Sequence, residues 1–144
     1  MDIVVLNNLT QNQLSDLQSL LFELVPGVVI SPDQIKNAIA DSWTHVFAAI
    51  DEGGHIRGCA VLCICTLLTG KQATVENVIV SSSCRGKHVG RSMMEFLIDY
   101  ARTHYGDMVI NLTSNPKRIA ANNLYRSLGF QQRETNVYKL AIRR

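Results

Sequence analysis

The sequence predicts an α/β fold of the α+β kind, with one central, mixed and mostly antiparallel sheet that has helices on both faces. Three observations lead to this class. The chain has 144 residues and a hydrophobic content of 47%, which suits one compact domain over residues 1–144. Its apolar residues alternate between helical and strand periodicity. The resulting order, β-α-α-β-β-β-α-β-α-β, contains no repeat or linker and suits helices packed on a sheet.

The N-terminal part is predicted to contain a strand and two helices. Residues 1–6 form a short apolar strand. Thr10 and Gln13 make a capping-box pattern before leucines at helical spacing, which predicts an amphipathic helix. Residues 26–27 are Pro-Gly and end this helix, and residues 31–34 are Ser-Pro-Asp-Gln, the pattern of a second helix start.

The middle of the chain is predicted to be an antiparallel meander. Residues 46–50 and 56–67 read as a hairpin joined by the Asp-Glu-Gly-Gly turn at 51–54. A further turn at 69–71 leads into a third strand over 73–80, which is rich in β-branched residues.

The last part returns to helical periodicity. A helix is predicted from residue 89 to near 106, followed by a short strand over 108–112. A second helix is predicted to be capped by Ser-Asn-Pro at 114–116 and to end at Gly129. Residues 135–142 are predicted to form the last strand.

Charge is distributed unevenly along the chain. Residues 1–84 contain three basic and eight acidic residues, whereas residues 85–144 contain eleven basic and four acidic ones, so the second half favours an anionic ligand. No basic run is interleaved with aromatic residues, which argues against a nucleic-acid partner. No stretch of about 20 apolar residues predicts a membrane span, and no signal-peptide pattern is present. We therefore expect a cytoplasmic protein.

The cysteines do not form a disulfide or metal pattern. Cys59, Cys63 and Cys65 crowd into one apolar run, and Cys84 stands in a predicted loop. We expect reduced thiols and no metal. His45, His55 and His104 are better explained by structural or solvated roles than by catalysis.

The most informative segment is a strand that passes through a polar turn into a helix. Val78, Ile79 and Val80 end the strand. The turn and the helix start then contain glycines and basic residues, namely Arg85, Gly86, Lys87, His88, Val89, Gly90 and Arg91. A helix start exposes backbone N–H groups and attracts phosphate, and glycine permits close approach. On composition alone, an ordinary solvated helix start explains the same residues.

Two motifs together resemble those of the GNAT family of N-acetyltransferases. The turn is similar to the family pattern Arg/Gln-x-x-Gly-x-Gly/Ala, with Arg85 and Gly90 at its ends and His88 at the usual middle glycine. Residues 121–130 are similar to the family ending Ala-x-x-Leu-Tyr-x-x-x-Gly-Phe, with Tyr125 as its tyrosine. Arg118 stands where many members have an asparagine.

The resemblance implies a GNAT-like fold and transfer of an acetyl group from acetyl-CoA to a primary amine of a small molecule or peptide. It implies that the backbone of residues 78–80 pairs with the pantetheine arm and that residues 85–91 hold the pyrophosphate, with Asn115 and Arg118 as further cofactor contacts. The acceptor would bind near residues 25–31, which are largely apolar.

Tyr125 matches the family's general acid, although helix periodicity alone favours a core tyrosine. Glu76 alternates with Val78 and Val80, so we expect a carboxylate among apolar neighbours. It serves either as a base, commonly through water, or as a binding group for the cationic acceptor.

Two other functions remain open. A protein of the same fold could bind acyl-CoA as a sensor or interaction module without turnover. A nucleotide-binding protein is disfavoured because the turn lacks the Gly-Lys-Ser/Thr ending of a Walker A loop. A homodimer is possible.

Overall fold

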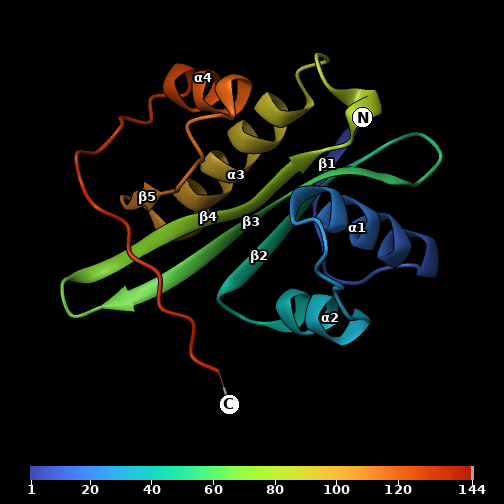
Figure 1. Ribbon diagram of the computed structural model, residues 1–144, viewed down its shortest axis with the longest axis horizontal. Helices are drawn as coiled ribbons and strands as arrows, with labels where there is room; N and C mark the ends of the chain where they lie inside the picture. The colour runs from blue at the N-terminus through green and yellow to red at the C-terminus, as the bar shows by residue number, and fades with distance from the viewer. Residues whose placement is uncertain (144) are drawn as a thin grey trace. The chain divides into compact units, whose positions relative to one another are not determined.

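The computed structural model describes residues 1–143 and contains the mixed sheet that the sequence predicts (Figure 1). In these described residues the sheet has five strands in the order β1-β2-β3-β4-β5. They are β1 (Asp2–Val5), β2 (Thr44–Ile50), β3 (Ile56–Leu67), β4 (Gly70–Val80) and β5 (Val109–Asn111). Neighbouring strands are antiparallel except for β4 and β5, which are parallel. The α+β class is therefore confirmed.

Helices cover both faces of this sheet (Figure 1). α1 (Gln11–Leu24) and α2 (Pro32–Ala40) pack on one face, and both begin with the predicted capping boxes, at Thr10 and Ser31. α3 (Val89–Tyr105) packs on the other face. Ala48 belongs to the core under α1 and α2, whereas its neighbour Ala49 belongs to the core under α3, as strand alternation requires.

A β-bulge interrupts the alternation of β4. Val61 pairs with Glu76 but Cys59 pairs with Ile79, so β4 has one extra residue, and Asn77 takes a positive φ of 49°. Residues opposite each other in a ladder share a face, so Glu76 shares its face with Ile79. The predicted alternation of Glu76 with Val78 and Val80 is therefore wrong, because it assumed a strand without a bulge.

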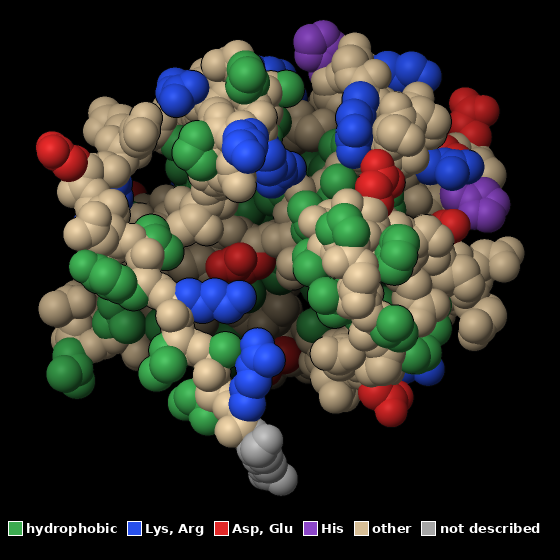
Figure 2. All heavy atoms as spheres, in the orientation of Figure 1, with side chains coloured by type: hydrophobic (Ala, Val, Ile, Leu, Met, Phe, Trp, Pro, Cys, Tyr) green, Lys and Arg blue, Asp and Glu red, His purple; other side chains and the backbone are tan. Residues whose placement is uncertain are grey.

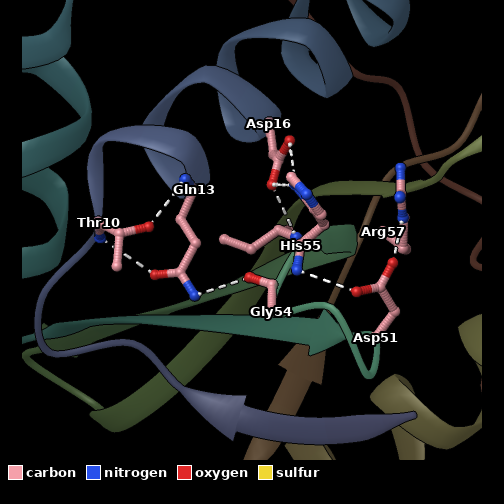
Figure 3. Close-up of polar contacts among 8 residues, drawn as sticks. Thr10, Gln13, Asp16, Asp51, Gly54, His55 and Arg57 are labelled. Carbon is pink, nitrogen blue, oxygen red and sulfur yellow. Dashed lines mark hydrogen bonds and ion pairs between the residues drawn. The ribbon is translucent and has the colours of Figure 1, made fainter.

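A polar network joins the β2–β3 turn to α1 (Figure 3). One Asp16 carboxylate oxygen, Oδ2, accepts from Nδ1 of His55 at 3.1 Å and from the backbone N–H of Ile56 at 3.0 Å. Asp51 accepts from the backbone N–H of His55 at 3.0 Å and from Nε of Arg57 at 2.7 Å. The hydrogen bond from Arg57 lowers the pKa of Asp51. His55 thus has the structural role expected for it.

The chain divides into two compact units, Met1–Thr113 and a second unit that begins at Ser114. The second unit contains α4 (Ile119–Ser127), after which Gly129 takes a positive φ of 99°. The N-cap of α4 is Arg118, so the cap predicted at 114–116 is wrong. The predicted strand over 135–142 does not form, and its apolar side chains Val137, Tyr138, Leu140 and Ile142 are 74 to 91% exposed. Strand propensity alone is insufficient here, since a strand also requires a ladder partner.

Among the helices of residues 1–143, none is long and apolar enough to cross a membrane. The same residues contain no group of three or more His, Cys, Asp and Glu placed to hold a metal ion. Burial raises the pKa of the Cys59 thiol to about 12, so this cysteine is a core residue with little nucleophilic character.

Candidate functional site

The turn between β4 and α3 has the backbone of an anion site. Gly86 and His88 both have positive φ, 77° and 62°, and Gly86 has open space where a Cβ would stand. His88 is the N-cap of α3, and its side chain makes no capping hydrogen bond. The first turn of α3 therefore presents N–H groups and the positive end of the helix dipole without a side-chain cap.

His88, which stands at the usual middle glycine of the motif, does not have a right-handed helical conformation. It is left-handed, with φ 62° and ψ 18°. Glycine adopts this conformation without a steric cost, and histidine is one of the residues that enter it more often than most. The geometry explains why a glycine suits this position and why histidine is still tolerated.

Two of the basic residues of this turn are paired with carboxylates. Arg85 places Nη2 2.8 Å from Oε1 of Glu23, a residue of α1, and its Nε donates to the carbonyl oxygen of Val80 at 3.3 Å. Arg91 pairs with Glu95 one helical turn later, at 3.3 Å. Lys87 is exposed on the turn. Figure 2 shows basic and acidic side chains together where β4 leads into α3.

The end of β4 lies beyond its ladder with β5. That ladder covers Gln72–Thr74, whereas β4 continues to Val80. Ile79 is buried in the core under α1, and Val80 packs toward α3. An extended chain can add to the edge of a sheet by pairing with backbone groups of the edge strand. Pairing of the pantetheine arm with Val78, Ile79 and Val80 remains a prediction.

Glu76 is exposed on the face that α1 and α2 cover. It lies opposite Val61, and its charge contributes, after burial, to the raised pKa of the nearby Cys63 thiol. Its surroundings are more open to solvent than the apolar environment that we expected from the sequence.

The second unit contains Tyr125, Asn115 and Arg118. Tyr125 is 5% exposed, and its ring meets that of Phe130 edge to face at 6.0 Å between centroids. Burial raises the pKa of Tyr125, and this is opposed by the charge of Arg118 and by a hydrogen bond from it. Asn115 accepts a hydrogen bond at its Oδ1 from the backbone of Lys117 at 2.9 Å. The structure therefore pairs Arg118 with Tyr125, which the sequence did not indicate.

The other histidine candidates have structural partners. The two ring nitrogens of His45 contact the hydroxyl groups of Tyr100 and Tyr105. Burial lowers the pKa of His45, with a smaller contribution from His104 and an opposing one from Asp41. His104 stacks on Tyr100 and bonds to its carbonyl oxygen.

The loop over residues 25–31 is apolar at the surface. Val25, Val28 and Val29 are 41, 44 and 87% exposed, whereas Ile30 packs against the core and its carbonyl accepts from Gln18 at 3.0 Å. Hydrophobic side chains are visible over the α1 and α2 side of the molecule (Figure 2). Glu23, two residues before this loop, is the site residue that the sequence did not reveal, because its partner is 62 residues away.

Comparison with known proteins shows similarity to acetyltransferases. Residues 13–130 match the sequence model described as "Acetyltransferase (GNAT) family". No curated protein sequence matches the chain. An acetyltransferase of Trypanosoma brucei is similar in structure, with 26% identity, a TM-score of 0.77 and coverage of 98% of this chain and 99% of that one.

Two enzymes of known substrate share the fold at lower identity. Glucosamine-6-phosphate N-acetyltransferase of Arabidopsis thaliana is 20% identical, with a TM-score of 0.76 and coverage of 96% of this chain and 97% of that one. An aminoglycoside 6'-N-acetyltransferase of Acinetobacter baumannii is 16% identical, with a TM-score of 0.77 and coverage of 98% and 97%. At these identities the similarity concerns the fold alone.

Proposed function

Since the chain belongs to the acetyltransferase (GNAT) family, we propose that it transfers the acetyl group of acetyl-CoA directly to a primary amine of a small molecule or peptide. The observation that carries the proposal is the turn from β4 into α3. It combines a helix N-terminus without a side-chain cap, two residues of positive φ and three basic side chains. These features together suit a pyrophosphate.

The cofactor would lie along β4 and over this turn. Backbone groups of Val78, Ile79 and Val80 would pair with the pantetheine arm and orient the thioester carbonyl. The pyrophosphate would be held by backbone N–H groups of the turn and by its basic side chains. The residues proposed for this role are Arg85, Gly86, Lys87, His88, Val89, Gly90 and Arg91. Asn115 and Arg118 are proposed as further contacts, although Arg118 also bonds to Tyr125.

The reaction requires two proton movements. The amine must be neutral to attack the thioester carbon, so that a C–N bond forms as the C–S bond breaks. Glu76 would accept the proton of the amine, through water, or else bind the cationic acceptor. Its exposure permits either role. Tyr125 would donate its hydroxyl proton to the departing CoA thiolate.

Acceptor-dependent release of CoA tests the proposal. The purified protein is incubated with acetyl-CoA and a panel of primary amines, and CoA and acetylated amine are quantified by mass spectrometry. Equal amounts of both products support the enzyme. Acetyl-CoA binding without acceptor-dependent release would instead identify a non-catalytic acyl-CoA-binding module. Calorimetry with CoA and with ATP tests the third alternative. Binding of CoA in preference to ATP excludes a nucleotide-binding protein.

We also propose that the protein acts in the cytoplasm and forms a homodimer. Four large apolar side chains in residues 137–142 are exposed, a composition that favours association between copies. Light scattering of the purified protein measures the oligomeric state, and a monomer at micromolar concentration would contradict the dimer. Cell fractionation tests the location.

A further inference from the structure

Glu23 connects α1 to the proposed cofactor turn. It lies in the last turn of α1, which contains no basic residue. The C-terminal end of a helix carries partial negative charge, so a carboxylate there is unfavourable unless a cation neutralises it. Arg85 supplies this cation through the 2.8 Å ion pair. The pairing therefore stabilises the end of α1 in the free protein.

The same guanidinium is a proposed phosphate ligand. Arginine binds phosphate through two parallel hydrogen bonds, which are stronger than those of an exposed ion pair with a carboxylate. The side chains of Arg85 and Glu23 are 57% and 39% exposed, so both can change partner. A pyrophosphate on Arg85 would also repel Glu23, because both are negatively charged. Binding of the cofactor should therefore release Glu23.

The released carboxylate would stand beside an apolar surface. Glu23 is followed after one residue by Val25, and Val25, Val28 and Val29 are all exposed in the next loop. A carboxylate next to apolar side chains suits a ligand that has an ammonium group and an apolar body.

We propose that Glu23 exchanges partners, pairing with Arg85 in the free protein and with the ammonium group of the acceptor once the cofactor phosphates hold Arg85. The inference rests on the proposed function and deepens it. It defines the acceptor as a cationic primary amine with an apolar body, and it makes acceptor binding dependent on the bound cofactor. Glu23 is a binding and positioning residue for the protonated acceptor, and the proton that the amine must lose before it attacks leaves by the route proposed above through Glu76.

The test compares Glu23→Gln with Glu95→Gln. The second variant also removes one carboxylate from an ion pair with a basic residue of the cofactor turn, but the carboxylate lies in α3 and its partner is Arg91. Calorimetry with CoA should show about two- to fivefold tighter binding to Glu23→Gln than to the wild type, since an exposed ion pair no longer competes. Unchanged or weaker binding would overturn the exchange. Circular dichroism verifies that both variants are folded.

A second titration uses phenethylamine as the probe of the acceptor site. Wild-type protein saturated with CoA should bind phenethylamine about two- to fivefold more tightly than the free protein. Glu23→Gln should bind phenethylamine equally tightly with and without CoA, whereas Glu95→Gln should keep the tighter binding in the presence of CoA. Equal binding to the free and CoA-bound wild type would overturn the acceptor role.

These outcomes are separable from those of the proposed function. A wild-type protein that does not bind CoA contradicts the cofactor site and the exchange together. A protein that binds CoA and shows the phenethylamine coupling, yet acetylates no amine of the panel, supports the exchange and contradicts the enzyme. A protein that acetylates amines with no effect of Glu23→Gln on either titration supports the enzyme and contradicts the exchange.

Discussion

Arg118 donates a hydrogen bond to Tyr125, which lies about two turns further along α4. The positive guanidinium favours the phenolate form of the tyrosine, whereas burial disfavours it. Arg118 stands where many family members have an asparagine, so its effect on Tyr125 distinguishes this chain from them.

Replacement of Arg118 by Ala should raise the pKa of Tyr125 further, because the opposing charge and hydrogen bond are lost while burial remains. The measurement is an ultraviolet titration of tyrosine ionisation in wild type and variant. Tyr125→Phe identifies the contribution of this residue among the four tyrosines. An identical titration in both proteins would show that Arg118 does not influence the phenol.

Tyr125→Phe should lower turnover, about 100-fold or more, with little change in acetyl-CoA affinity. The substitution removes the proposed proton donor but keeps the ring that packs on Phe130. Steady-state kinetics give the turnover, and calorimetry gives the affinity. Unchanged turnover would remove Tyr125 from the acid role.

Gly90→Glu should weaken CoA binding, because a carboxylate in the first turn of α3 repels phosphate and crowds its approach. Gly90→Ala is the matched control, since it adds a Cβ without charge. We expect a loss of about tenfold or more for the glutamate variant and a smaller loss for alanine. Retained affinity in both variants would indicate that the cofactor binds elsewhere.

His88→Gly should increase the free energy of unfolding by up to about 1 kcal/mol, because glycine adopts the left-handed conformation without the steric cost that a Cβ brings. The added freedom of the unfolded chain reduces this gain. Urea unfolding measures the difference. His88→Ala keeps the Cβ and should show no gain, so an equal effect of the two variants would contradict backbone strain as the cause.

Stability should fall as the pH falls through 6.5, the ordinary pKa of histidine, because the pKa of His45 is lower in the folded protein. As the pH falls below 6.5, the unfolded chain binds a proton at His45 before the folded protein does. Protonation therefore favours the unfolded chain until the pH reaches the pKa of His45 in the folded protein. His45→Gln does not titrate and should show a weaker dependence in this window. Thermal unfolding between pH 7.5 and 5 measures it, and parallel curves for the two proteins would exclude His45.

Local signals predicted most of the fold. The capping boxes at Thr10 and Ser31 are complete within four residues each, so the sequence contains all that defines these helix starts. The strand over 135–142 was predicted wrongly, because its alternation cannot show whether a partner strand pairs with it. A pattern of alternating residues indicates that a segment has strand propensity, whereas formation of the strand depends on pairing with a segment that is distant in the sequence.

The candidate site was predictable where it is contiguous in sequence. The turn at Arg85 follows directly from a strand and precedes a helix, so this local arrangement could be predicted, and its role as an anion site stays a prediction. Two features of the site could not be predicted from the sequence. Glu23 reaches this turn only through the packing of α1 on the sheet, and the bulge at Asn77 has no signal in a strand of β-branched residues.

The bulge at Asn77 also determines how β4 should be varied in protein engineering. Before the bulge, even-numbered positions such as Thr74 and Glu76 lie on the face of the sheet that α1 and α2 cover. After the bulge, the odd-numbered residue Ile79 lies on this face. A combinatorial library aimed at the acceptor side should therefore randomise 74, 76 and the residues of the loop, and leave Val80 unchanged. A design based on simple alternation would place half of its diversity in the wrong layer.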